Sequence, residues 1–185
     1  MNVNCVRLNE SLRSDYYRLH SERCDAGWCF CVAWWTEDWE SFPQRSAIRN
    51  RALRDELFAV GQYDGYLIYL DDEVAGWSQC GQRDRLPKLL STYRLEPDPS
   101  TWAYTCFLLP EKWRGRNLGH EILRLSLQDL RQRGVRRVQG FPRRGADLEP
   151  EDAWQGTERM YQRAGFTCIR ESDDWPVYEI GLKPE

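Results

Sequence analysis

The chain of 185 residues is 41% hydrophobic and 13% aromatic, which is enough apolar material for a full core, and we expect residues 1–185 to form a single domain. Its 26 Lys and Arg residues against 29 Asp and Glu residues give a net charge of −3, so the total charge favours neither nucleic acid nor an anionic membrane as a partner. The N-terminus lacks the apolar core of a signal peptide and no window has the apolar length of a membrane span, so we expect a cytoplasmic location.

The first half of the chain predicts two helices and three strands. A short strand is expected at Asn4–Leu8, followed by a helix over Ser11–Cys24. Apolar residues recur at helical spacing over Ser46–Val60, which predicts a second helix. Two β-type runs, Tyr66–Leu70 and Val74–Cys80, flank a polar turn and predict a hairpin.

The second half alternates between strand and helix patterns. Arg83–Pro99 is punctuated by proline and is expected to be irregular, leading into a strand at Trp102–Leu109. An amphipathic helix follows a glycine-containing turn and ends at Gly134. The last elements are expected to be a strand, a helix and two strands, at Val135–Phe141, about Trp154–Ala164, Phe166–Arg170 and Val177–Leu182. The order predicts an α/β fold with a mixed sheet covered by helices.

The segment Arg114–Gly119, between the fourth predicted strand and the third predicted helix, reads R-G-R-N-L-G. A helix start directs unpaired backbone N–H groups and the positive end of the helix dipole at one point. Arg114 and Arg116 add positive charge, and Gly115 and Gly119 have no Cβ, so a diphosphate can approach the main chain closely. The segment therefore predicts an anion site, although similar glycine turns also occur as plain connections.

The charges are unevenly distributed. Residues 112–144 contain ten Lys or Arg against two Asp or Glu, whereas residues 145–185 contain four against ten. This pattern suits an anionic cofactor beside the first stretch and a cationic substrate near the second, and solvated helix faces explain it equally well. Nucleic-acid binding through the basic stretch is disfavoured, because its arginines lack interleaved aromatic residues and the net charge is negative.

A segment rich in tryptophan and cysteine, residues 27–43, holds four tryptophans and two phenylalanines without a clear helical period. Such a segment lines either the core or a pocket. Cys24, Cys29 and Cys31 have a C-x4-C-x-C spacing, but neither His20 nor His120 is a convincing fourth ligand, so we expect no metal site. The seven cysteines are an odd number, and reduced thiols that pack as small hydrophobic residues are expected.

The chain resembles the GNAT superfamily of acetyl-CoA-dependent acyltransferases in the order of its elements and in two segments, R-G-R-N-L-G and the later M-Y-Q-R-A-G-F. Within that superfamily, it is most similar to a bacterial branch that has a segment like C-F-C-V-A-W-W. The cofactor loop of that family is written Q/R-x-x-G-x-G/A, and here Asn117 stands where the inner glycine usually lies. Asparagine tolerates left-handed backbone better than most residues. The resemblance implies a single domain with a mixed, mostly antiparallel sheet of about seven strands and about four helices, which uses acetyl-CoA and needs no metal.

The resemblance also implies roles for individual residues. Main-chain groups of Phe107, Leu108 and Leu109 are expected to pair with the pantetheine arm, with the N–H of Leu109 meeting the developing oxyanion. Tyr161, five residues before Phe166, is expected to protonate the departing thiolate, because a phenol with a pKa near 10 can donate to a thiolate of similar basicity. The diphosphate is expected to contact Arg114, Gly115, Arg116, Asn117, Leu118, Gly119 and His120.

The acceptor and the general base stay open at this point. The acceptor is expected to be an amine of a small molecule or a peptide, and Trp34, Trp35, Trp39 and Trp77 are candidates for an aromatic wall around it. No Asp or Glu lies on the predicted strand 102–109, and we assign the base to none of the other candidates, which are Glu37, Asp38, Glu40 and Glu179. A CoA-binding regulatory or sensor module without turnover is the alternative, and exposed tryptophans would suit a homodimer surface.

Overall fold

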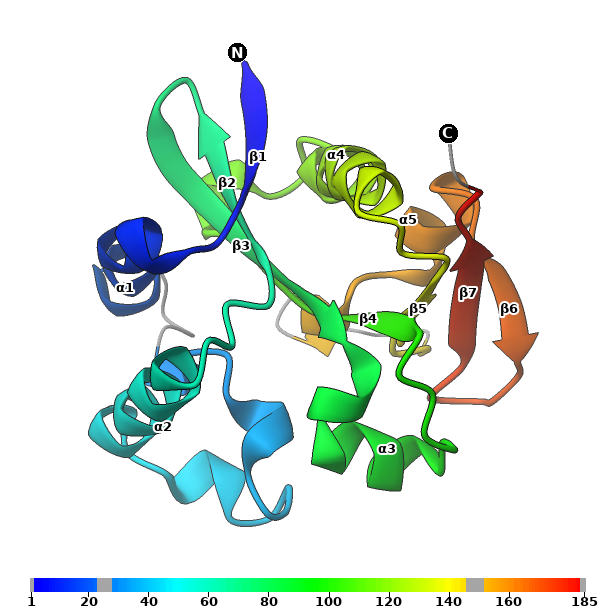
Figure 1. Ribbon diagram of the computed structural model, residues 1–185, viewed down its shortest axis with the longest axis horizontal. Helices are drawn as coiled ribbons and strands as arrows, with labels where there is room; N and C mark the ends of the chain where they lie inside the picture. Colours follow the sequence, from blue (N-terminus) through cyan, green and yellow to red (C-terminus); the bar gives the residue numbers. More distant parts are fainter. Residues whose placement is uncertain (1, 23–27, 146–151, 184–185) are drawn as a thin grey trace.

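The computed structural model describes residues 2–22, 28–145 and 152–183, and its strands form one sheet (Figure 1). The seven strands of this sheet lie in the order β1-β2-β3-β4-β5-β7-β6. β4 and β5 are parallel, whereas every other neighbouring pair is antiparallel. The strands are β1 (Val3–Arg7), β2 (Tyr66–Leu70), β3 (Glu73–Gln82), β4 (Thr101–Leu108), β5 (Arg137–Gly140), β6 (Thr167–Arg170) and β7 (Val177–Gly181). The predicted mixed and mostly antiparallel sheet is confirmed.

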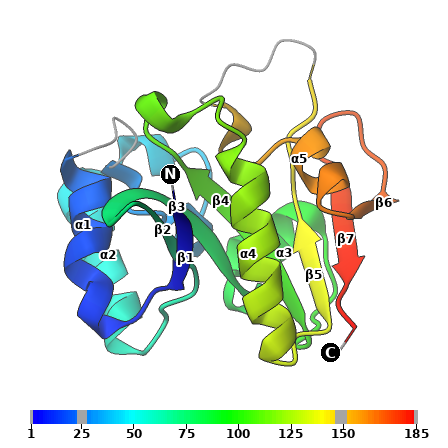
Figure 2. The same cartoon turned by 90° about the horizontal axis from the view of Figure 1, so that it is seen from above.

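Helices cover both faces of the sheet (Figures 1 and 2). One core lies between the sheet and the first two helices and continues under the third, and the core on the opposite face lies under the last two helices. The α-helices are α1 (Arg13–Glu22), α2 (Ala47–Ala59), α3 (Pro87–Tyr93), α4 (Leu118–Gln132) and α5 (Glu158–Arg163). Within the described ranges, no helix is long and apolar enough to cross a membrane.

Two local differences from the sequence-based expectations have clear causes. The Arg83–Pro99 segment, expected to be irregular, contains the helix α3, because Pro87 occupies a first-turn position where proline is well tolerated. The helix expected from Trp154 onward is interrupted at Gly156, which has a φ of +89°. A 3₁₀ turn precedes this glycine, and α5 follows it with Thr157 as its N-cap. The described part of the chain therefore has five α-helices where about four were expected.

The helix α4 is held against β4, and this contact fixes the direction of its N-terminus. Of the apolar positions expected to face the core, Leu118, Ile122, Leu123, Leu127 and Leu130 are buried and Leu125 is half-buried. Full burial of one leucine side chain stabilises the fold by about 2 kcal/mol. Ser126 takes one further buried position, where its Oγ donates to the carbonyl of Ile122 at 2.6 Å and hydrogen-bonds to the hydroxyl of Tyr104.

The centre of β4 is irregular on both of its edges. On the β3 side, Gln79 pairs with Cys106 and the next residue, Cys80, pairs with Tyr104, so Thr105 is an extra residue that forms a β-bulge. On the β5 side, pairing runs from Thr101 to Tyr104 and stops there, although β4 continues to Leu108. The last four residues of β4 therefore have no strand partner on that side within the described residues.

The close packing of β5 against α5 leads to a first prediction. A methyl group added to Gly140 would lie 2.2 Å from Cε1 of Tyr161, whose ring is fully buried among other side chains. We expect Gly140→Ala to lower the free energy of unfolding by about 3 kcal/mol, measured by urea denaturation. Gly181→Ala on the neighbouring β7 is the matched control, because nothing lies within 4 Å of its added methyl group. Equal stability of the two variants would refute this packing.

Candidate active site

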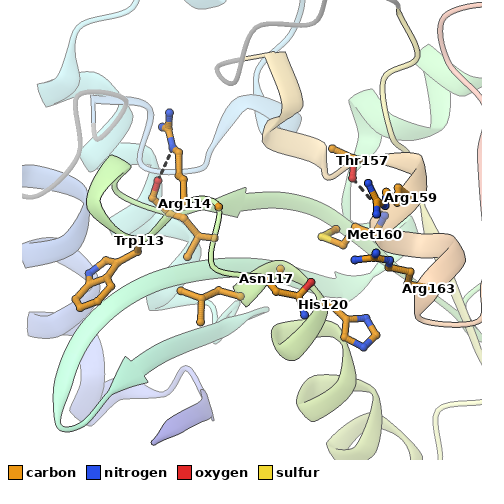
Figure 3. A pocket seen from close by; sticks show the side chains of 12 residues that line it. Trp113, Arg114, Asn117, His120, Thr157, Arg159, Met160 and Arg163 are labelled. Carbon is orange, nitrogen blue, oxygen red and sulfur yellow. Dashed lines mark hydrogen bonds between the residues drawn. The ribbon is translucent and has the colours of Figure 1, made fainter. Parts of the chain in front are cut away.

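A pocket of about 650 Å³ lies between the start of α4 and the facing side of α5 (Figure 3). One wall comes from the end of β4 and the turn before α4, and the opposite wall comes from α5 and its N-cap. The lining residues are Leu109, Trp113, Arg114, Gly115, Asn117, Leu118, Gly119, His120, Thr157, Arg159, Met160 and Arg163. Seven of the residues predicted to bind the cofactor line this pocket together, which places the predicted anion site at an open cavity.

The turn before α4 has the backbone that an anion site needs. Gly115 and Asn117 both have left-handed backbone, with φ values of +72° and +62°. Asparagine thus adopts the conformation for which glycine is usual, as its tolerance of this region predicts. The side chain of Asn117 makes no capping hydrogen bond to the first turn of α4, so the leading N–H groups of this helix have no acceptor within it.

The arginines around the turn differ in what they contact. Arg114 donates from Nε to the carbonyl of Leu109 at 2.9 Å, which ties the turn back to the end of β4. Arg116 does not line the pocket, and its guanidinium lies 5.1 Å from the ring centre of Trp113. Trp113 itself lines the cavity and contributes an apolar surface to its wall.

The opposite wall carries two arginines that the sequence analysis missed. Arg159 and Arg163 are one helical turn apart on α5, both are exposed, and both extend toward the start of α4 (Figure 3). Neither pairs with a carboxylate of the described residues. Between them Met160 packs close to Gly119, where an added methyl group would lie 2.6 Å from the methionine sulfur. The R-x-x-x-R spacing on a helix facing the anion turn is the signal that would have identified them.

The three residues predicted to pair with pantetheine lie on the part of β4 that has no β5 partner. Leu109 follows the strand and lines the pocket, whereas Leu108 is buried in the core between the sheet and the N-terminal helices. Phe107 is half-buried on the other face, with its ring stacked on that of Tyr104 at 5.7 Å. The unpaired edge is the arrangement that backbone pairing with an extended ligand requires.

Tyr161 is fully buried beneath the pocket wall. Its hydroxyl donates to the carbonyl of Gln155 at 2.8 Å, and its ring packs against Gly140 and, at 6.2 Å between ring centres, against Phe107. Burial raises the pKa of the phenol well above its usual range, so the side chain is protonated at neutral pH. Transfer of this proton to a thiolate requires the hydroxyl to leave its Gln155 acceptor. The general-acid role stays a prediction.

No candidate for the general base gains support from its surroundings. Glu37, Asp38 and Glu40 are all exposed. Glu179 on β7 accepts a 2.8 Å hydrogen bond from Gln139 and lies 3.8 Å from Arg137, so both of its oxygens already have partners.

The aromatic residues proposed for the acceptor site do not line this pocket. Trp34 contacts the irregular centre of β4, where its indole N–H donates to the carbonyl of Thr105 at 3.4 Å. Trp35 is half-buried below the guanidinium of Arg54, and Trp77 is fully buried in the core. Trp39 and Trp175 are the exposed tryptophans of the described residues, and a homodimer built on them stays a prediction.

Among the described residues, no group of three or more His, Cys, Asp or Glu side chains could hold a metal ion. Cys24, one of the three residues in the C-x4-C-x-C spacing, lies outside the described residues. The thiols of Cys5, Cys31, Cys80 and Cys168 form no disulfide.

Comparison with known proteins agrees with this arrangement. A model of the acetyltransferase (GNAT) family matches residues 28–166, whereas no curated protein matches the chain significantly. Among solved structures, the ribosomal L7/L12 alpha-N-protein acetyltransferase in complex with coenzyme A has a TM-score of 0.60 at 16% identity, covering 100% of this chain and 97% of that one. The PaiA N-acetyltransferase from Thermoplasma acidophilum in complex with coenzyme A has a TM-score of 0.56 at 10% identity, with 98% and 99% covered.

A third similar structure is the ribosomal-protein-S18-alanine N-acetyltransferase from Escherichia coli, with a TM-score of 0.54 at 12% identity and 100% and 96% of the two chains covered. These identities are low, and the likeness to solved structures concerns the fold. The family match covers about three quarters of the chain, including the turn, α4 and the whole pocket. The chain is therefore an acetyltransferase that belongs to the GNAT family.

Proposed function

We propose that this protein is a cytoplasmic N-acetyltransferase that moves an acetyl group from acetyl-CoA to a primary amine by direct attack. The observation that supports this most is the left-handed turn at Gly115 and Asn117, which leads into an uncapped helix start beside an open pocket with arginines on both walls. A helix start of this kind binds phosphate groups through its N–H groups and dipole. Acetyl-CoA supplies a diphosphate, a 3′-phosphate, and an acetyl group activated as a thioester.

The proposed binding mode divides acetyl-CoA among three parts of the site. The N–H groups at Leu118, Gly119 and His120 hold the diphosphate at the start of α4. The amide groups of the pantetheine arm pair with the free edge of β4 at 107–109. Arg159 and Arg163 face the diphosphate from α5 and compensate the remaining phosphate charge.

The proposed chemistry needs one nucleophile, one donor to oxygen and one proton. The neutral amine attacks the thioester carbonyl carbon, and the oxygen gains negative charge that the N–H of Leu109 meets. Collapse of this intermediate breaks the C–S bond, and Tyr161 gives its proton to the sulfur of the departing CoA. The amine loses its extra proton to water, because no carboxylate of the described residues is available on β4.

The acceptor class follows from the same proposal. Two similar structures are N-acetyltransferases of ribosomal proteins, and the proposal here extends to both peptide and small-molecule amines. The acceptor class is tested by measuring the release of free CoA thiol with a chromogenic disulfide. The amines in the panel are peptides with free N-termini, lysine peptides, polyamines and aromatic amines. We expect release that depends on both acetyl-CoA and one class of amine. Binding of CoA without release across the whole panel would instead favour the regulatory module.

The arginines of α5 give a separate prediction. We expect the double variant Arg159→Gln and Arg163→Gln to bind CoA about tenfold more weakly. The reason is that two cations, which pair with no carboxylate of the described residues, face the phosphates across the pocket. Calorimetry with CoA and with dephospho-CoA measures the effect and shows which phosphate the arginines bind. Arg124→Gln on α4 is the control, because Arg124 is paired with Glu121 and does not line the pocket. Unchanged CoA affinity in the double variant would contradict the assignment.

A further inference from the structure

A strained turn lies on the other face of the sheet, at Phe30 and Cys31. Both residues have left-handed backbone, with φ values of +42° and +47°, and neither is glycine. The hydroxyl of Tyr16 donates to the carbonyl of Phe30 at 2.7 Å. Arg54 donates to the carbonyls of Phe30 and Cys31 at 3.1 Å and 2.6 Å. Backbone strain of this kind persists only where the surroundings hold it, and it is concentrated at functional sites.

Arg54 brings a positive charge into this part of the core. The side chain is 1% exposed, and no carboxylate of the described residues pairs with it. The rings of Tyr16, Trp35 and Phe58 lie 5.0–5.6 Å from its guanidinium carbon. A buried cation normally has an anionic partner, because removing it from water is costly. The thiol of Cys31, which can take a negative charge, lies on the turn that Arg54 holds, and the charge of Arg54 acts on it.

The side chain of Cys31 lies over the centre of the sheet. Its S–H group donates to Oε1 of Gln79 at 2.6 Å, and Gln79 is the cross-strand partner of Cys106. Burial by itself raises the pKa of Cys31, but hydrogen bonding with the thiol of Cys106, the charge of Arg54 and the indole of Trp77 outweigh it, so the pKa is lowered. Cys31 and Cys106 lie in the same buried cluster, and Gln79 contacts the first and pairs with the second across the strands.

Two buried donors lie next to this sulfur, and neither makes a hydrogen bond of normal geometry with another described residue. They are the indole N–H of Trp77 and the Nε2 group of Gln79. Rotating the Gln79 amide by half a turn would direct Nε2 at the sulfur, and the two orientations are nearly equivalent in shape. A thiolate at Cys31 would therefore accept hydrogen bonds from both donors and compensate the charge of Arg54. A neutral thiol carries no charge to balance that of Arg54 and is a weak acceptor for the two donors.

Cys80 provides a comparison within the same chain. It is 1% exposed, against 4% for Cys31, and it follows Gln79 directly on β3, where it packs in the core under α4. Burial raises the pKa of Cys80 well above its usual range. Two thiols with nearly the same burial thus have opposite surroundings, because only Cys31 has a buried cation and unpaired donors beside it.

We propose that Cys31 and Cys106 form a redox-active pair, in which a small peroxide oxidises Cys31 and Cys106 then closes a disulfide with it. The Cys31 sulfur attacks one peroxide oxygen, the O–O bond breaks, and the departing hydroxide takes a proton to give water and a sulfenic acid. The Cys106 sulfur, after losing its proton, attacks the Cys31 sulfur, an S–S bond forms, and the S–O bond breaks to release a second water. The two thiols lose two electrons in total, and the peroxide gains them.

The disulfide would connect the strained turn to β4 beside the bulge at Thr105. Burial of both sulfurs limits access to small reagents, so hydrogen peroxide is expected to react well and bulky alkylating agents poorly. The proposal does not depend on acetyl transfer, because it rests on Cys31, Cys106 and their neighbours alone.

The test uses the wild-type protein, treated with substoichiometric hydrogen peroxide and then digested for mass spectrometry. We expect a peptide pair linked through Cys31 and Cys106 that disappears with dithiothreitol, and oxidation of Cys31 at least about tenfold faster than that of Cys80. Linkage of Cys31 to Cys29, or equal rates at Cys31 and Cys80, would overturn the proposal.

Two variants separate the two chemical steps. Cys106→Ser should stop at the sulfenic acid, which a dimedone probe traps at Cys31, whereas Cys31→Ser should give neither disulfide nor dimedone adduct at Cys106. Circular dichroism checks that each variant is folded, and the wild-type peptide map needs no variant at all. Dimedone labelling at Cys106 in the Cys31→Ser variant would show that Cys106 is the reacting thiol and would overturn the assignment.

Discussion

Replacement of Tyr161 by Phe is expected to lower turnover about 100-fold while CoA affinity changes less than twofold. The reason is that the phenol supplies the proton for the CoA thiolate, and a general acid contributes roughly 10²–10⁴-fold to a rate. The ring of Tyr161 packs against Gly140 and Phe107 and is kept in the Phe variant, so the pocket wall keeps its shape. Steady-state release of thiol and calorimetry with CoA measure the two effects separately.

Loss of the hydrogen bond to Gln155 accompanies this substitution, so a control for structural damage is needed. Tyr178→Phe removes the hydroxyl that donates to Glu158. The ring of Tyr178 stacks on that of Tyr161, with 6.3 Å between the ring centres, and is kept in the variant. This control should keep most of its turnover. An acetyl thioester of a more acidic thiol has a leaving group that needs less protonation, so it should partly restore the turnover of the Tyr161→Phe variant. Equal turnover of wild type and Tyr161→Phe would remove Tyr161 from the mechanism.

Substitution of Gly115 by Asp is expected to weaken CoA binding by at least about tenfold. Gly115 lines the pocket within the turn that leads to α4, and its left-handed backbone is one that Asp and Asn tolerate. Nothing lies within 4 Å of an added Cβ there, so the new side chain fits without a clash. A carboxylate facing a diphosphate across partly solvated space costs about 1.4 kcal/mol, which is tenfold in affinity.

The matched control is Gly115→Asn, which has nearly the same shape and backbone preference without the charge. Calorimetry at two salt concentrations compares the two variants, and the difference between them should shrink as salt rises. If the Gly115→Asp and Gly115→Asn variants bound CoA with equal affinity at low salt, the diphosphate would not lie at this turn.

The part of the site that the sequence predicted best is the part determined by local rules. The R-G-R-N-L-G segment specifies its own turn, because glycine and asparagine supply left-handed backbone and the leucine rows of the following helix set where α4 begins. Residues 109 and 114–120 accordingly come together at one cavity, with the exception of Arg116, whose side chain lies against Trp113.

The features that the sequence analysis missed depend on tertiary contacts. Arg159 and Arg163 belong to the site only because α5 crosses opposite the start of α4, which no local pattern reports. The bulge at Thr105 and the end of pairing at Tyr104 follow from how three strands meet. The helix α3 was missed for a local reason, since Pro87 was interpreted as a break and it begins the helix.

A crystal structure of the protein with bound CoA is the most direct test of the central claim, that the start of α4 holds the diphosphate. We predict density for the diphosphate against the N–H groups that follow Asn117, with Arg159 and Arg163 on its other side. Density for CoA elsewhere on the protein, with this turn empty, would contradict the account.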